Sequence, residues 1–250
     1  MGEDGLMRLT VVGSGDAFGS GARFQTCIAL TTDPIGPPRV LVDCGATSLT
    51  ALRQQQLNPN DIDTVLVSHL HGDHFGGLPF LVLDGQFRRR TEDLTIVGPA
   101  GTRARLEQAM EALYPGSTAV RRRFDVHVLE HVDRRPLQHG PLRITPFEVR
   151  HASGAPAYAL RVESPTGSMA YSGDTEWTDT LLDAAANVEV FLCEGYSPTP
   201  VRWHLDLDTL ARYRDQFSCR ELVLTHLSPT ALASDLTSWR VAHDGLQLGV

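Results

Sequence analysis

The sequence predicts an α/β protein in which mixed sheets form a layered sandwich with helices on the outside. Apolar, β-branched runs of strand length recur along the whole chain and outnumber the helical patterns. The early runs follow one another without a helical pattern between them, which favours mixed sheets over a doubly wound parallel sheet. No linker, low-complexity tract or change in composition divides the chain, so we expect one domain over residues 1–250.

Twelve apolar runs are expected to be strands, since many are β-branched and bounded by Gly, Pro or Asp. In chain order they cover residues 9–12, 27–30, 39–43, 64–68, 94–98, 124–130, 142–149, 157–162, 168–173, 188–194, 221–226 and 239–242. Helices are expected over residues 47–57, 101–116 and 206–217, because Thr, Ser or acidic residues open each pattern. A further helix is expected to begin within residues 75–83.

The charge of the chain narrows the function classes. The formal net charge is −8, and all 22 basic residues are Arg. Without lysine the chain has no Schiff-base chemistry, no Walker lysine and no lysine general base. A net negative chain is also a poor generic nucleic-acid binder, because attraction to phosphates needs a positive field. Two triplets, Arg88–Arg90 and Arg121–Arg123, are expected to be solvated surface, with a phosphate-binding patch as the alternative.

The N-terminus and the cysteines predict a cytoplasmic protein. The opening stretch "MGEDGLMRLT" is acidic where a signal peptide would be basic, and no apolar run reaches transmembrane length. We therefore expect no membrane partner. The cysteines are scattered through apolar or strand-like contexts and are expected to be buried thiols, not a disulfide framework. They are Cys27, Cys44, Cys193 and Cys219.

The stretch "SHLHGDHFGG" contains the strongest chemical signal in the chain. It carries His69, His71, Asp73 and His74 between a predicted strand and a predicted helix start. The pattern HxHxDH is expected by chance in roughly one chain of this kind in a thousand. Imidazole and carboxylate together suit Zn²⁺ first, with Mn²⁺ or Fe as alternatives. One four-coordinate ion cannot use all four ligands and keep an open position, so either some are not ligands or two metals share further ligands.

Three further candidates lie downstream, and each ends an apolar run. His151 follows "LRITPFEVR", Asp174 follows "MAYSG", and His226 ends "ELVLTH". A single histidine after a strand is usually structural, whereas three metal-capable residues in equivalent positions favour a shared site.

The ordered set "VDCG", "SHLHGDHFGG", "RHASG", "SGDT" and "LTHLSP" resembles the metallo-β-lactamase superfamily, within it the ribonuclease Z-like and phosphodiesterase-like hydrolases. The resemblance covers nearly the whole chain. It implies a four-layer αβ/βα sandwich of two pseudo-equivalent halves, with outer helices and a dimetal site at the sandwich edge. The implied ligands are His69, His71 and His151 for one metal, Asp73, His74 and His226 for the other, and Asp174 as the bridge.

The resemblance also implies the catalytic residues, which are His204, Asp73 and Asp43. Asp43 would orient a ligand histidine, with a strand-end turn as the alternative. His204 would protonate the leaving group, with a buried structural histidine as the alternative because its neighbours are apolar. Glu194 would either orient His204 or simply end its strand. A hydroxide bridging the two cations would attack phosphorus in line, so no side-chain nucleophile is needed.

Departures from individual branches narrow the substrate. A carboxylate at Asp174 disfavours the β-lactamases that place Cys there, and only 24 residues follow His226, too few for the helical extension of glyoxalase II. Between His151 and Asp174 the chain has room for a strand, a turn and a strand, so the tRNA-gripping arm of ribonuclease Z is missing. Near the N-terminus, residues 15–27 ("GDAFGSGARFQTC") replace the cysteine-rich zinc loop of the phosphonate-pathway phosphodiesterases.

We therefore expect a metal-dependent hydrolase of ester bonds with two divalent ions and a small phosphodiester as substrate, cyclic diesters included. A tRNA 3′-processing endonuclease without the exosite arm, gripping RNA with the Arg triplets, is the first alternative. A diiron redox protein on the same scaffold is the second. Nucleic acid is disfavoured as a partner, and a homodimer is implied only because relatives of this kind are often dimers.

Overall fold

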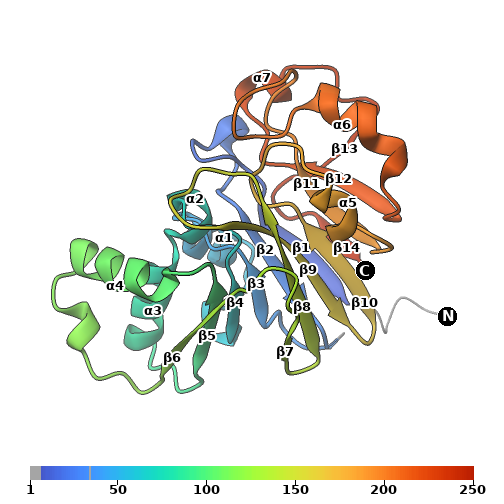
Figure 1. Ribbon diagram of the computed structural model, residues 1–250. Coiled ribbons are helices and arrows are strands. Elements are labelled where there is room, and N and C mark those ends of the chain that lie inside the picture. The colour runs from blue at the N-terminus through green and yellow to red at the C-terminus, as the bar shows by residue number, and fades with distance from the viewer. Residues whose placement is uncertain (1–6, 34) are drawn as a thin grey trace.

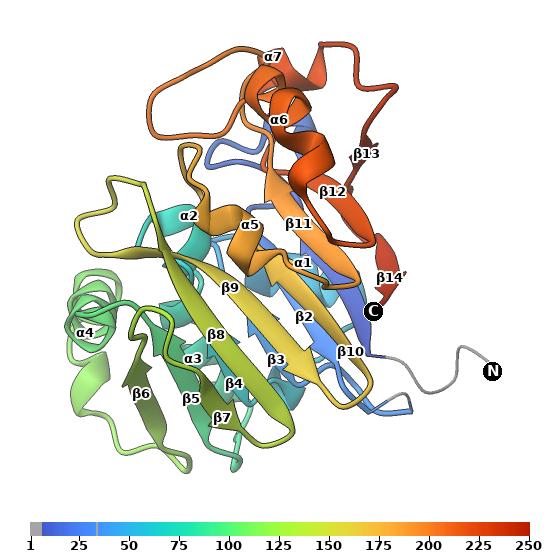
Figure 2. The same cartoon turned by 45° about the vertical axis from the view of Figure 1, so that its right-hand side comes forward.

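The structure is a computed structural model that describes residues 7–33 and 35–250. Two seven-stranded sheets pack face to face, and helices cover both outer faces (Figures 1 and 2). Both sheets are mixed, so the predicted layered sandwich with outer helices is confirmed.

The first sheet comes from the N-terminal half of the chain together with the last strand. Its spatial order is β14-β1-β2-β3-β4-β5-β6. From β3 to β6 neighbouring strands are parallel, and the other pairs are antiparallel. The strands are β1 (Arg8–Gly13), β2 (Cys27–Thr31), β3 (Val40–Val42), β4 (Thr64–Leu66), β5 (Leu94–Gly98), β6 (Val126–Glu130) and β14 (Gln247–Gly249).

The second sheet repeats this plan, with the order β13-β12-β11-β10-β9-β8-β7. From β10 to β13 neighbouring strands are parallel, and the other pairs are antiparallel. Each of the twelve predicted runs contains a strand; only the short β7 and β14 were not predicted. The strands are β7 (Leu137–His139), β8 (Leu142–Val149), β9 (Ala157–Ser164), β10 (Gly167–Tyr171), β11 (Val190–Glu194), β12 (Glu221–Thr225) and β13 (Arg240–Val241).

The helices lie on the outer faces and at the strand ends. The α-helices are α1 (Ser48–Gln54), α2 (Gly72–Phe75), α3 (Leu78–Phe87), α4 (Thr102–Leu113), α5 (Thr180–Ala184), α6 (Leu207–Tyr213) and α7 (Pro229–Leu232). Short 3-10 helices cover Ser20–Ala22, Pro59–Asp61, Ser117–Ala119 and Arg214–Gln216. The predicted helices at 47–57, 101–116 and 206–217 correspond to α1, α4 and α6. The helix start predicted within residues 75–83 corresponds to α3. The unpredicted α2, α5 and α7 are too short to show a helical period.

Apolar side chains form three cores, one between the sheets and one under each outer layer of helices. In β9, Leu160 and Val162 face the core between the sheets, whereas Ala157 and Ala159 face the core under the helices of the second half. Because both faces of the strands are covered, several predicted runs are apolar at consecutive positions and do not alternate.

The cysteine prediction holds for three of the four residues. All four cysteines are free; Cys27, Cys44 and Cys193 are buried, but Cys219 is only partly buried, in the turn before β12. Among the described residues, no helix is both long and apolar enough to cross a bilayer.

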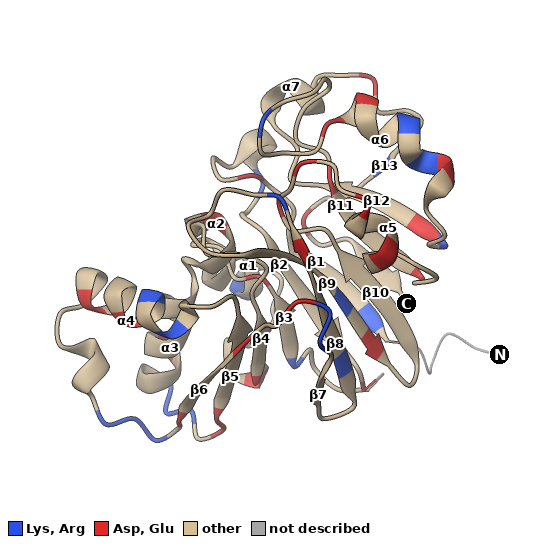
Figure 3. Ribbon diagram, in the orientation of Figure 1, with Lys and Arg blue, Asp and Glu red and all other residues tan. Residues whose placement is uncertain are grey.

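The two arginine triplets lie together at the end of α3 and the start of β6, where Figure 3 shows blue segments of the ribbon. Arg90 departs from the predicted solvated surface, because it is buried. Its guanidinium lies 5.4 Å from the ring centre of Phe124, and its Nε donates to the carbonyl oxygen of Glu92 at 2.6 Å. Arg90 therefore fastens the end of α3 and is not available for an anion.

A buried histidine that is not among the predicted metal ligands follows β6. Nε2 of His131 lies 3.1 Å from the carbonyl oxygen of Val67, and the imidazole contacts the Tyr158 ring edge-on at 5.3 Å. Burial lowers the pKa of His131 to about 4. The folded protein therefore holds this side chain neutral at pH values where the unfolded chain protonates it.

The free energy of unfolding is expected to depend on pH through His131. Well above pH 6.5 both states are neutral there; as the pH falls towards 4, chiefly the unfolded state gains the proton, so stability is lost. His131→Gln keeps a donor without titrating. Over this range the wild type should lose about 3 kcal/mol more than the variant. Urea unfolding of metal-free protein measures this difference, with exposed His243→Gln as the matched control. Parallel pH curves for His131→Gln and the wild type would contradict the prediction.

Candidate metal centre

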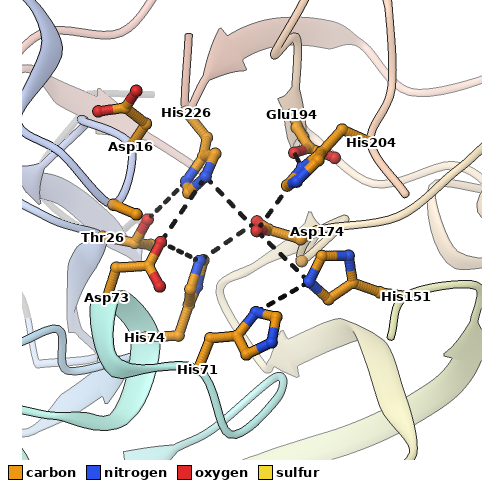
Figure 4. Close-up of polar contacts among 12 residues, drawn as sticks. Asp16, Thr26, His71, Asp73, His74, His151, Asp174, Glu194, His204 and His226 are labelled. Carbon is orange, nitrogen blue, oxygen red and sulfur yellow. Dashed lines mark hydrogen bonds and ion pairs between the residues drawn. The ribbon is translucent and has the colours of Figure 1, made fainter. Parts of the chain in front are cut away.

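Six strands end at one edge of the sandwich, and a candidate residue stands at each end. β3 is parallel to β4, β10 to β12 are parallel, and β8 runs with β10 because each is antiparallel to β9. The side chains at these ends therefore meet in one cluster, most of which Figure 4 shows. They are Asp43 after β3, His69 after β4, His151 after β8, Asp174 after β10, Glu194 in β11 and His226 after β12.

The first group of candidate ligands is His69, His71 and His151, which bring their donor atoms within 4.8 Å of one another. Nδ1 of His71 lies 3.0 Å from Nε2 of His151. Nδ1 of His151 donates to the carbonyl oxygen of Trp203 at 2.8 Å, so its Nε2 faces the cluster. Such a hydrogen bond on the outer nitrogen fixes the ring of a metal-binding histidine.

The second group is Asp73, His74, Asp174 and His226, all of them buried. Nε2 of His74 lies 3.2 Å from Oδ2 of Asp73 and 3.2 Å from Oδ1 of Asp174. Nε2 of His226 lies 3.4 Å from Oδ2 of Asp174. The short helix α2 supplies Asp73 and His74, so consecutive residues of one turn reach the same point.

Asp174 belongs to the second group and also lies close to the first. Its Oδ2 is 3.9 Å from Nε2 of His69 and 3.9 Å from Nε2 of His151, in addition to its contacts in the second group. The residue before it, Gly173, has φ of +61°, and a Cβ there would lie 2.8 Å from the carbonyl oxygen of Tyr158. Only glycine fits this turn, which aims the carboxylate between the groups.

Asp43 binds a histidine of the second group on the side that faces away from the cluster. It is fully buried, and its Oδ2 accepts from Nδ1 of His74 at 2.7 Å. The backbone nitrogen and the hydroxyl of Ser68 donate to the same carboxylate, each at 2.7 Å. Asp43 has φ of +59°, so it both turns the chain at the strand end and orients a histidine. The two roles that the sequence left open are compatible.

The donor atoms fit divalent cations. Three buried atoms that face the cluster have no hydrogen-bond partner among the described residues: Nε2 of His69, Nε2 of His74 and Oδ1 of Asp174. Leaving such an atom unsatisfied costs about 1–3 kcal/mol, which a bound cation would offset. Tetrahedral ligands about 2.0 Å from zinc lie roughly 3.3 Å apart. The closest donor pairs here are 3.0, 3.2 and 3.4 Å apart.

The shifted pKa values favour an ionised Asp174 and a neutral His69, which are the forms that bind a cation. Burial alone would raise the pKa of Asp174, but His226 and His74 hold that pKa well below its usual value. Burial lowers the pKa of His69 well below its usual value. Burial would also lower the pKa of His74, but Asp174 and the other carboxylates around it raise it well above its usual value. A cation that binds at His74 therefore displaces a proton.

His204 and Glu194 form a pair beside the cluster. Nδ1 of His204 donates to Oε1 of Glu194 at 2.5 Å, while Oε2 of Glu194 accepts from the backbone nitrogens of Thr175 and Leu205. Both Glu194 oxygens thus accept hydrogen bonds, and the bond through Oε1 orients His204. Nε2 of His204 has no hydrogen-bond partner among the described residues, and 22% of the side chain is exposed. This histidine is not sealed in the core.

The structure adds residues that the sequence did not single out. The ring of Tyr196 stacks on that of His204, with centres 4.3 Å apart and planes at 24°. Oγ1 of Thr26 lies 3.3 Å from Nδ1 of His226. The backbone of Trp203, with φ of +74°, provides the carbonyl oxygen that holds His151. Only the position of Tyr196, two residues after a strand-end glutamate, was a signal visible in the sequence.

Comparisons with known proteins agree with this fold. YhfI from Bacillus subtilis, described as a metallo-β-lactamase fold protein, superposes with a TM-score of 0.76 at 20% identity, over 97% of this chain and 99% of that one. The short form of human tRNase Z gives the same TM-score, 0.76, at 20% identity, again over 97% and 99% of the two chains. The predicted four-layer metallo-β-lactamase sandwich is therefore confirmed.

Sequence similarity identifies the family of the chain within this fold. Uncharacterized protein Rv1339 of Mycobacterium tuberculosis (strain ATCC 25618 / H37Rv) is 35% identical over 240 residues, which cover 93% of this chain and 85% of that protein. A family model described as "Anti-Pycsar protein Apyc1" matches residues 7–240. The chain, with its metallo-β-lactamase fold, thus belongs to the family of the anti-Pycsar protein Apyc1.

Proposed function

We propose that this protein is a metal-dependent phosphodiesterase that hydrolyses a small phosphodiester, cyclic diesters included. The observation that carries the proposal is the pair of donor groups joined by Asp174, with His204 held by Glu194 beside them. A paired cation site is suited to charge on phosphoryl oxygens, and an oriented histidine is suited to a leaving oxygen.

The residues of the chain divide the work. Two bound divalent cations would acidify water to provide the nucleophile and neutralise charge on the phosphoryl oxygens. His204 gives the proton on its free Nε2 to the leaving oxygen, while Glu194 keeps the imidazole in place through Nδ1. Asp43 keeps Nε2 of His74 directed at the cluster. In this mechanism no Ser, Cys or Thr side chain serves as the nucleophile.

Two features support a small substrate over tRNA. The interval between His151 and Asp174 holds only the hairpin of β9 and β10 and no arm. The Arg121–Arg123 triplet precedes β6, whereas the metal-capable residues follow β4, and both strands are parallel to β5. The triplet therefore lies at the opposite end of the sheet, roughly 16 Å away by strand rise. Human tRNase Z, by its name, acts on tRNA, a chain of phosphodiesters, which is consistent with the bond type.

Zn²⁺ is the first choice of metal, with Mn²⁺ or Fe as alternatives that the same ligands accept. The diiron redox alternative expects an extra carboxylate ligand. Glu194 is a metal-capable carboxylate beside Asp174, and its oxygens already accept three hydrogen bonds. We therefore keep hydrolysis as the proposal; a homodimer stays a prediction from the resemblance.

Metal removal tests the proposal. Purified protein of measured metal content is expected to hydrolyse bis(p-nitrophenyl) phosphate, to lose this activity on dialysis against a chelator, and to regain it with Zn²⁺ or Mn²⁺. Because three buried donor atoms lose their partner, the metal-free protein should also unfold at a lower temperature. Full activity in protein shown by elemental analysis to contain no metal would rule the proposal out.

A further inference from the structure

We propose that the hydroxyl of Tyr196 donates a hydrogen bond to a non-bridging oxygen of the substrate phosphoryl group, while its ring holds His204 in place. The inference rests on the proposed phosphodiesterase function and assigns a binding role within that site. It makes Tyr196 a second donor beside His204, with a different target on the substrate.

The backbone of Tyr196 is fixed from two sides. Its nitrogen donates to the carbonyl oxygen of Leu205 at 3.0 Å, and its carbonyl oxygen accepts from the nitrogen of Ser228 at 3.1 Å. The ring stacks on His204 with centres 4.3 Å apart, and it lies 6.1 Å from the ring of His226. Tyr196 therefore spans from the proposed proton donor to a candidate metal ligand.

The hydroxyl of Tyr196 is free to bind a substrate. It makes no hydrogen bond to any described residue, and the side chain is partly exposed. Tyr171 differs, because it is fully buried and its hydroxyl lies 3.5 Å from Nδ1 of His74. Burial, followed by the charges of Asp16 and Glu194, raises the pKa of Tyr196. A phenol is ordinarily protonated at neutral pH, so the hydroxyl can act as a donor.

The charges of the site are compatible with a neutral donor there. In the described part of the chain, the carboxylates Asp43, Asp73, Asp174 and Glu194 form ion pairs with histidines alone, and none with arginine. The chain has no lysine at all. Apart from bound cations and His204, an uncharged donor can thus meet charge on the phosphoryl oxygens, and an unpartnered phenol beside the cluster is suited to this.

The non-bridging oxygen is the target because His204 already serves the leaving oxygen. A hydrogen bond to a non-bridging oxygen strengthens as charge gathers on the phosphoryl group, and it does so whatever the leaving group is. Loss of the hydroxyl should therefore affect good and poor leaving groups equally. Loss of the ring should in addition free His204 and so affect poor leaving groups more.

The experiment compares Tyr196→Phe, which keeps the ring, with Tyr196→Leu, which removes it. Tyr213→Phe is the matched control, since Tyr213 stacks on Trp177 at 4.0 Å and contacts no residue of the cluster. Substrates are bis(p-nitrophenyl) phosphate and diphenyl phosphate, whose phenol is the poorer leaving group. Tyr196→Phe is expected to lower kcat/KM about tenfold to a hundredfold on both esters. Tyr196→Leu should lose more, chiefly on diphenyl phosphate.

The affinity for inorganic phosphate provides a second test that does not depend on turnover. Calorimetric titration of the metal-loaded proteins with inorganic phosphate is expected to give about tenfold weaker binding for Tyr196→Phe than for Tyr213→Phe. Equal kcat/KM and equal phosphate affinity in these two variants would overturn the inference. A loss confined to diphenyl phosphate would also overturn it, because it would make the hydroxyl a leaving-group donor. Loss of metal from Tyr196→Phe would show a structural role instead.

The two proposals fail differently. If the wild type hydrolyses no diester in its metal-loaded form, the proposed function fails. The phosphate titration then still decides whether Tyr196 donates to a phosphoryl oxygen. If the wild type is active and Tyr196→Phe matches it in both measurements, only the assignment of Tyr196 fails.

Discussion

Asp174→Asn is expected to reduce hydrolysis of bis(p-nitrophenyl) phosphate by roughly a thousandfold or more, equivalent to about 4 kcal/mol, and to release at least one of the two cations. Asp174 is the residue that contacts both donor groups, through His74 at 3.2 Å, His226 at 3.4 Å, and His69 and His151 at 3.9 Å. The substitution keeps the size of the side chain but removes the negative charge that two neighbouring dications need.

Elemental analysis after metal loading, together with steady-state kinetics, measures the effect of Asp174→Asn. Asp93→Asn is the matched control. Asp93 belongs to a similar but exposed group with Asp125 and His127, whose donor atoms also lie within 4.8 Å of one another. Metal content and activity should be unchanged in Asp93→Asn. Retention of both cations and of activity in Asp174→Asn would show that this carboxylate does not join the two groups.

His204→Ala is expected to lower kcat by about a hundredfold to ten-thousandfold while metal content stays that of the wild type. Nδ1 of His204 is bound to Glu194 and its Nε2 is free, so removing the ring removes the proton source while the two donor groups keep all of their own side chains. The loss should be larger for diphenyl phosphate than for bis(p-nitrophenyl) phosphate, because nitrophenolate leaves without much help.

Glu194→Gln tests the same pair from the other side. The amide can keep the hydrogen bonds from Thr175 and Leu205, but it lacks the charge that stabilises His204 when protonated. We expect a smaller loss than in His204→Ala, with the same dependence on the leaving group. If His204→Ala instead loses a cation, or slows both esters equally, His204 is a ligand or a structural residue and not the acid.

The sequence predicted those parts of the fold that depend on local pattern. The run "AYALRV" is apolar at nearly every position because β9 is covered on both faces, and such runs are readable without coordinates. The helix α5 and the strand β7 have only five and three residues, too few for a period to show. Arg90 resembled its exposed neighbours in sequence, and only the approach of Phe124 made it a buried anchor.

The sequence by itself determined the candidate ligands, because HxHxDH and the strand-end positions of His151, Asp174 and His226 are local features. It did not determine which atom each ligand presents. That depends on long-range hydrogen bonds, such as Asp43 to His74 and the Trp203 carbonyl to His151, between segments 31 and 52 residues apart. Tyr196 became a candidate donor for the same reason. Which side chains the chain offers is a local property, whereas the direction of a lone pair or a hydroxyl depends on what folding packs against it.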